Sequence, residues 1–309
     1  MGVHAFILRR LGAVVPVLLA VSVLVFLMSH LTPGDPATIM LGENASAADI
    51  GRLRHELGLD RPLAVQYGRY LAGVARGDLG RSIRSGRPVA LEIWERFPPT
   101  LQLTLAAMAI ASAAGVLLGA LAATSRTGIA DALLMGTSLL GISMPSFWRG
   151  LLLILLFGLT LHWLPIAGGG DWRALVLPAV TLGAQPAAVL ARLTRASLLD
   201  VLPSDFVRTA RAKGVAGVRV LFRHALRNAL IPVVTVMGLQ FGSLLGGAVI
   251  VESVFARSGL GRFAVAAVQS RDFPVIQGIV LFAAAVYALV NLSVDVVYLA
   301  IDPRITYGE

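Results

Sequence analysis

The sequence contains no cysteine, which excludes disulfide bonds, thiolate metal sites and cysteine nucleophiles. Charged residues make up only 14% of the chain, against roughly a quarter of an average soluble domain. The single lysine, Lys213, is followed by glycine and valine, so the chain lacks the Gly-x-x-x-x-Gly-Lys-[Ser/Thr] loop that binds ATP phosphates. The H-E-x-x-H and G-x-S-x-G motifs of hydrolases are also absent. Energy for any driven process must therefore come from a partner or an ion gradient.

Apolar residues dominate instead, and they occur in uninterrupted runs that indicate membrane spans. Leu11–Leu31 carries no charged residue and, at ~1.5 Å per residue, can cross a hydrocarbon core of ~30 Å. It is too long for the apolar core of a signal peptide, and no small-x-small cleavage site follows it. We therefore expect an uncleaved first span with its N-terminus inside.

The rest of the chain is expected to cross the membrane five more times. Ala132–Leu164 is too long for one straight span and is either one helix kinked around Pro145 or two crossings. The charge of residues 192–227 decides between them: eight Lys and Arg against two Asp give a net +6, which favours the cytoplasm. Two crossings would put this loop outside, so we expect one. The other predicted spans are Leu101–Ala123, Ala174–Ala191, Ala229–Val251 and Val275–Ala300.

Residues 32–98 form the main insertion between spans, and we expect them to be external. Their charges are mixed, nine basic and eight acidic, as is typical of a solvated surface. Helix-start and helix-stop residues predict short helices over Ser46–Gly58 and Pro62–Gly77, and a third that starts at Pro88. The expected domains are the first span (1–31), this insertion (32–98), a five-span core (99–301) containing a cytoplasmic loop (192–228), and a C-terminal tail (302–309).

Residues 204–228 form a basic helix–turn–helix between two spans. Ser204 is expected to cap the first helix, Asp205 to occupy its first turn, and Gly214 to end it in a left-handed conformation. Phe206, Val207 and Ala210 are predicted to share an apolar face, with Arg208 and Arg211 on another. A second helix is expected over Val218–Arg227. By itself, such a hairpin is most often a surface that faces anionic lipid.

The sequence of this hairpin is specific. Asp205-Phe-Val-Arg-Thr-Ala-Arg-Ala-Lys-Gly214 and Arg223-His-Ala-Leu-Arg-Asn-Ala-Leu-Ile-Pro232 resemble the "EAA" coupling loop of ABC importer permeases, in its dipeptide/oligopeptide/nickel branch. The chain departs from the general motif because Arg208 and Thr209 stand where Glu and the first Ala are usual. Other segments that resemble this branch lie at 31–36, 57–62, 77–80, 96–101, 145–148, 163–165, 246–252 and 302–304.

This resemblance covers nearly the whole chain and implies an all-α, six-span permease of the type I (MetI-like) fold. It implies import of peptides or a related solute, without a catalytic or metal-binding residue in this chain. Residues implied in coupling to the ATPase are Asp205, Arg208, Thr209, Ala210, Arg211, Lys213 and Gly214.

The implied partners are a second homologous permease, two ATP-binding subunits (or one fused) that hold ATP and magnesium, and an external substrate-binding protein. The implied setting is the lipid of a bacterial or archaeal plasma membrane, and no nucleic acid is expected. Which peptide, nickel chelate or other solute is carried is not encoded in these motifs.

A gradient-driven secondary transporter is the alternative. It calls for inverted repeats and several carboxylates at mid-membrane depth, whereas the spans contain only Asp295 and no evident repeat. Asp295 is expected to be structural, and Arg149 to pair with other groups or reach an interface. His162, beside Trp163, is expected to anchor the chain at the membrane surface. Glu252 is a candidate outer-gate or receptor contact.

Overall fold

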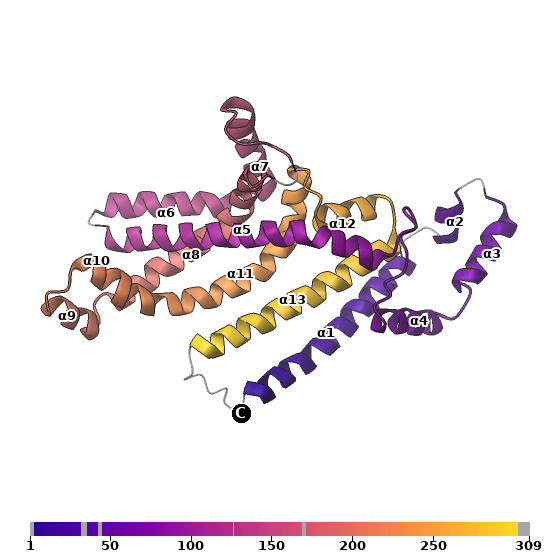
Figure 1. Ribbon diagram of the computed structural model, residues 1–309, viewed down its shortest axis with the longest axis horizontal. Helices are drawn as coiled ribbons and strands as arrows, with labels where there is room; N and C mark the ends of the chain where they lie inside the picture. Colours follow the sequence, from indigo (N-terminus) through magenta and orange to yellow (C-terminus); the bar gives the residue numbers. More distant parts are fainter. Residues whose placement is uncertain (1–2, 32–35, 43–44, 126, 169–170, 302–309) are drawn as a thin grey trace. The chain divides into compact units, whose positions relative to one another are not determined.

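The computed structural model describes residues 3–31, 36–42, 45–125, 127–168 and 171–301 (Figure 1). Within them the chain is helical, and the one β-type pairing is an isolated bridge between Arg81 and Pro88. The all-α prediction is confirmed. Two predicted features, the C-terminal tail 302–309 and most of the motif at 31–36, lie outside the described residues.

The elements follow one another in a simple order. The α-helices are α1 (Val3–Leu31), α2 (Pro36–Leu41), α3 (Ala47–Leu57), α4 (Leu63–Ala75), α5 (Val89–Thr124), α6 (Gly128–Ser143), α7 (Ser146–Leu153), α8 (Arg173–Val201), α9 (Asp205–Ala212), α10 (Gly217–Arg219), α11 (Leu226–Val254), α12 (Leu260–Gln269) and α13 (Phe273–Ile301). Two π-helical segments join them, η1 (Ile154–Thr160) after α7 and η2 (Val220–Ala225) before α11.

The described residues contain five helices that are long and apolar enough to cross a membrane, or six spans if one bent pair of helices counts as a single span. The five are Arg10–Leu31, Val89–Thr124, Arg173–Val201, Gly217–Val254 and Phe273–Val296. The bent pair joins α6 to α7 and η1 at an angle of 110°. The break falls at Met144-Pro145, as the sequence predicts.

A proline and an arginine explain why the chain can break there. Gly141 O would normally accept a hydrogen bond from the N–H of residue 145, but Pro145 has none. The Arg149 guanidinium replaces it, donating from NH1 to Gly141 O at 2.7 Å and from Nε to Thr181 O of α8 at 3.1 Å. Arg149 is buried, at 8% exposure. The expectation that it pairs with other groups is confirmed, because it ties the broken helix to its neighbour.

The chain divides into two compact units, and the unit formed by Thr100–Arg257 and Val290–Glu309 contains the central spans. Its helices α5 and α8 approach so closely that glycine is required. A Cβ added at Gly115 would lie 2.7 Å from Leu190 Cβ, and one at Gly183 would lie 2.5 Å from the Ala107 carbonyl oxygen. Such small-residue contacts let backbones pack closely within a bilayer.

The other unit comprises Met1–Pro99 and Ser258–Leu289. Polar contacts attach α1 to its neighbours: Ser22 Oγ lies 2.9 Å from Tyr67 OH of α4, and Gln277 Nε2 of α13 donates to Ser29 Oγ at 2.8 Å. A buried apolar cluster joins α5, α12 and α13. Its members are Val89, Ile93, Leu260, Ala267, Val275 and Ile279.

The short helices of the insertion largely follow their predicted boundaries. Asp49 N donates to Ser46 Oγ at 3.1 Å, and Gly58 ends α3 with a left-handed φ of 68°. The helix expected to start at Pro88 is different. It does not end within the insertion but continues as α5 to Thr124, because residues on both sides of residue 99 have buried helical faces.

We predict that Arg149→Met destabilises the purified protein by about 1–3 kcal/mol, since it leaves buried carbonyls without donors. Arg149→Lys should recover only part of this loss, because one ammonium group lacks the planar fork that spans Gly141 O and Thr181 O. Thermal unfolding in detergent is the measurement, with the exposed Arg173→Met as control. Equal midpoints for Arg149→Met and wild type would contradict this role.

Candidate functional site: the basic hairpin

The hairpin predicted to couple the protein to an ATPase folds around α9. This helix of eight residues ends in a Schellman motif, in which Val215 N donates to Ala210 O at 3.3 Å and Gly214 N to Arg211 O at 3.0 Å. Gly214 has a φ of 75°, so the predicted left-handed stop is confirmed.

The predicted cap at the start of α9 is wrong. Ser204 has the extended backbone of a cap residue, but its hydroxyl makes no bond to the N–H groups of α9. Ser204 Oγ instead donates to Val201 O at 2.5 Å. This carbonyl belongs to the last turn of α8, where carbonyl oxygens lack helical partners. Ser204 therefore closes α8 and fixes the turn into α9.

One face of α9 is buried against the ends of three spans. Val207 is fully buried and Ala210 is 7% exposed. They belong to one apolar cluster with Ala120 of α5 and Leu198 of α8. The cluster also contains Val220 and Ala225 of η2 and Leu226 and Ala229 of α11. Any displacement of α9 therefore acts directly on α5, α8 and α11.

The opposite face of α9 is exposed. Six of the seven predicted coupling residues are exposed: Asp205, Arg208, Thr209 and Arg211 on α9, and Lys213 and Gly214 directly after it. The seventh, Ala210, is buried against the spans. Phe206 is also exposed, at 45%, which corrects the expectation that it shares the apolar face with Val207. At α9 a phenyl ring and several cations thus face away from the spans.

The second helix of the hairpin is not a separate element. Helical backbone runs without interruption from Gly217 to Val254, 38 residues in all, through η2. The expected helix over Val218–Arg227 is therefore the first part of the fifth span. The sequence could not show this, because the polar residues Arg223, His224, Arg227 and Asn228 interrupt the apolar pattern without interrupting the backbone.

An ion pair fastens the neighbouring spans beside the hairpin. Arg195 of α8 donates to both oxygens of Asp131 of α6, from Nε and NH2, at 2.6 Å each. Such bidentate pairs fix orientation as well as distance. This pair was not foreseen, because its two residues are 64 positions apart and each resembles an ordinary loop charge.

Glu252 lies near the other end of α11 and is fully buried. Its Oε1 accepts a hydrogen bond from Thr100 Oγ1 at 2.5 Å, and its backbone carbonyl accepts one from Arg257 N at 2.9 Å. In this conformation Glu252 joins α11 to α5 and presents no surface to a receptor. Asp295 is half-buried on α13.

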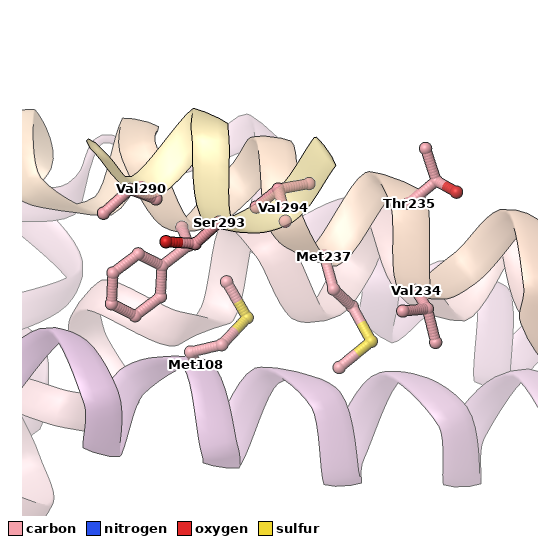
Figure 2. Close-up of a pocket in the computed structure, with 9 residues that line it drawn as sticks. Met108, Val234, Thr235, Met237, Val290, Ser293 and Val294 are labelled. Atoms are coloured by element: carbon pink, nitrogen blue, oxygen red, sulfur yellow. The ribbon is translucent and has the colours of Figure 1, made fainter. Parts of the chain in front are cut away.

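A cavity of about 450 Å³ opens between α5, α11 and α13, within the compact unit formed by Thr100–Arg257 and Val290–Glu309. It has no charged residue in its lining, which consists of Met108, Val234, Thr235, Met237, Gly238, Phe241, Val290, Ser293 and Val294. Figure 2 shows the flexible side chains of Met108 and Met237 facing this space. The sequence gives no sign of the cavity, since apolar residues that line a space and those that pack look alike in a span.

The described residues contain no group of three or more His, Cys, Asp or Glu that could hold a metal ion.

Comparison with known proteins agrees with the hairpin's sequence. Residues 115–307 match the family described as "Binding-protein-dependent transport system inner membrane component". Residues 3–104 match the N-terminal model of such membrane components. The chain is 51% identical over 302 residues to the glutathione transport system permease protein GsiC of Salmonella paratyphi A, with 98% of this chain and 99% of that protein covered. The protein of the same name from Escherichia coli (strain K12) is 50% identical, with the same coverage.

Solved structures show the same fold. The inward-facing MetNI methionine ABC transporter matches with a TM-score of 0.58 at 19% identity, covering 69% of this chain and 97% of that one. An amino acid ABC transporter matches with a TM-score of 0.50 at 21% identity. The family match and the relatives of about 50% identity set aside the alternative of a secondary transporter. The chain belongs to the family of inner membrane components of binding-protein-dependent transport systems, and it is a multi-pass permease of an ABC importer that works with a separate ATPase and a binding protein.

Proposed function

We propose that α9 is the coupling helix through which the partner ATPase moves this permease. The observation that carries this proposal is the burial of Val207 and Ala210 against α5, α8 and α11. An eight-residue helix whose one face is held by three spans, while its other face is exposed, is suited to transmit a rigid-body displacement.

The motion is transmitted as follows. ATP and magnesium are bound by the partner subunits, because this chain has no phosphate-binding loop. The ATPase surface contacts Phe206 and the exposed cations of α9. When the ATPases close, α9 shifts, and the packed ends of α5, α8 and α11 shift with it, since tightly packed elements move as units. The spans then alternate between inward-open and outward-open arrangements.

The assembly that this mechanism requires has two permeases and two ATP-binding subunits (or one fused), with the binding protein outside. A second homologous permease completes the path, because one set of six spans forms only half of it. The coupling residues proposed for this chain are the seven of the α9 segment, Asp205, Arg208, Thr209, Ala210, Arg211, Lys213 and Gly214, together with the anchor Val207.

The proposed cargo is glutathione or another short peptide. The support comes from the relatives of about 50% identity that are named glutathione permeases. The cavity between α5, α11 and α13 is consistent with this cargo and is proposed to line the path. An uncharged wall lets a zwitterionic peptide pass without a strong ion pair that would retain it, while selection is left to the binding protein.

We predict that Gly214→Leu lowers peptide uptake per ATP hydrolysed in reconstituted vesicles. A side chain at a φ of 75° costs about 1 kcal/mol, whereas nothing in the chain lies within 4 Å of an added Cβ. Gly214→Asn is the matched control, because asparagine tolerates the left-handed region better than leucine. Equal coupling in wild type and Gly214→Leu would contradict a coupling role for the hairpin.

We predict that substitutions on the two faces of α9 impair different steps of transport. Val207→Ala removes buried contacts worth about 1.5 kcal/mol and should leave ATP hydrolysis intact while uptake falls. Phe206→Ala, on the exposed face, should weaken retention of the ATPase during purification. Both quantities are measured on the complete complex, by uptake assay and by subunit stoichiometry. Identical phenotypes would show that the two faces do not have separate roles.

The cavity can be tested because the chain has no cysteine of its own. We predict that Met237→Cys reacts with a water-soluble thiol reagent, and faster during ATP turnover, when the path opens alternately to each side. Ala111→Cys is the control, since this α5 residue is fully buried between helices. Equal and slow labelling of the two variants, with and without ATP, would exclude the cavity from the path.

A further inference from the structure

A turn of residues 80–88, here called the arginine turn, precedes α5 and is closed by its own backbone. Ser82 N donates to Arg87 O and Gly86 N to Ser82 O, each at 3.0 Å, and Val89 N donates to Gly80 O at 3.0 Å. The isolated bridge between Arg81 and Pro88 lies at its base. The turn is thus a compact structure rather than an extended linker.

A buried carboxylate holds the turn in place. Asp272, which precedes α13, is 3% exposed. It accepts hydrogen bonds from Ser82 Oγ at 2.5 Å, Ile83 N at 3.1 Å and Arg84 N at 3.3 Å. A carboxylate that accepts several bonds, two of them from backbone N–H groups, fixes both the position and the conformation of the segment that donates them.

A second buried carboxylate supports the same turn from α5. Glu92 is 3% exposed, and its Oε1 accepts a hydrogen bond from Ser85 Oγ at 2.5 Å. Arg96 lies 3.6 Å from the other oxygen of Glu92 and 4.0 Å above the ring centroid of Phe263 on α12. The turn is therefore attached to α5 and to the α12–α13 corner, all within one compact unit.

The exposed side of this rigid turn is cationic. Residues 81–88 contain three arginines and no acidic residue, and Arg271 is exposed next to Asp272. Arg87 pairs with Glu95 at 2.6 Å. Arg81, Arg84 and Arg271 are exposed and form no ion pair with a carboxylate among the described residues. Arg81 also donates from NH1 to the Gly86 carbonyl within the turn at 3.0 Å, whereas the backbone of Arg84 is bonded to Asp272 and Arg271 precedes it. Three exposed cations that no described carboxylate neutralises are thus held at this turn.

The side of the membrane on which the turn lies follows from charge. The turn belongs to the insertion of residues 32–98, whose nine basic and eight acidic residues nearly balance, whereas residues 192–227 carry a net +6 that favours the cytoplasm. The insertion is therefore expected to be external, on the side where a binding protein delivers its cargo.

We propose that the arginine turn is a docking surface for an acidic patch on the external binding protein. This inference rests on the assembly given under Proposed function. Guanidinium groups pair with carboxylates through two parallel hydrogen bonds. They therefore bind most strongly to a partner whose carboxylates are held in a fixed geometry. A preorganised turn also loses little conformational entropy on binding. Fluid lipid headgroups or a passing solute would gain little from a turn held by two buried carboxylates.

The role of the positive charge of the arginine turn in docking is tested with Arg81→Glu/Arg84→Glu in the complete transporter in nanodiscs. Association of the purified binding protein should slow at least about tenfold at low salt and much less at high salt, because such charges act mainly by steering. ATP hydrolysis without the binding protein should be unchanged, and its stimulation by the binding protein should fall. Arg61→Glu/Arg69→Glu makes the same charge change elsewhere in the insertion and is the matched control.

The role of Asp272 in holding the arginine turn is tested with Asp272→Asn, which leaves every arginine in place. We expect nearly normal association but dissociation about tenfold faster, because the turn keeps its charge and loses its fixed geometry. This separates positioning from charge. If this variant fails to assemble, the double arginine variant still decides the main question.

The proposal is overturned if Arg81→Glu/Arg84→Glu binds the binding protein as wild type does, or if the control pair causes the same loss. It is also overturned if only the association of the transporter with anionic vesicles changes, which would indicate a lipid surface. If the wild-type transporter itself neither binds nor responds to the binding protein, the proposed assembly is wrong, and the docking role of the arginine turn falls with it.

Discussion

Satisfying the backbone inside a bilayer is the constraint on which this structure depends. Water is absent there, so each broken helical hydrogen bond needs a replacement from the protein. The bend between α6 and α7 shows the solution, since the guanidinium of Arg149 takes the place of the N–H that Pro145 lacks. Arg149, a buried charge that would suggest a role in transport, therefore has a structural role, because it donates hydrogen bonds to backbone carbonyls. With the bend held in this way, α6, α7 and η1 can form one bent span, which brings the candidate spans of the described residues to six.

Close contact between helices is the second requirement, and it allows a displacement of the hairpin to be passed on to the spans. α5 and α8 touch through glycines that leave no space for a side chain. Such an interface cannot deform gradually, because any shift of one helix displaces atoms of the other. The bidentate pair of Arg195 and Asp131 extends this stiffness to α6. A force on the buried face of α9 is thus distributed over four helices.

Much of this architecture could be predicted from residues alone. Long charge-free runs located the spans, Pro145 located the bend, and Gly214 located the end of α9, because each acts through local chemistry. Errors arose where distant contacts decide. Phe206 has the same polarity as Val207, yet only the latter faces Leu198 and Ala120. Ser204 had two possible partners, and the carbonyl of Val201 won over the N–H groups of α9. The cavity lining carried no distinguishing residue type.

The unbroken helix from Gly217 to Val254 has a mechanical consequence. The first part of this 38-residue helix can bend at η2 and Pro232, but the part beyond Pro232 contains neither, so a push from the hairpin tilts that part as a unit. Thr100 and Glu252 grip the helix close to its last residue, and the apolar cluster around α9 holds its start. The hydrogen bond between Thr100 and Glu252 is then a fulcrum. A small thrust from the cytoplasm becomes a tilt about this point, and its amplitude is set by the length of the lever rather than by the strength of any single contact.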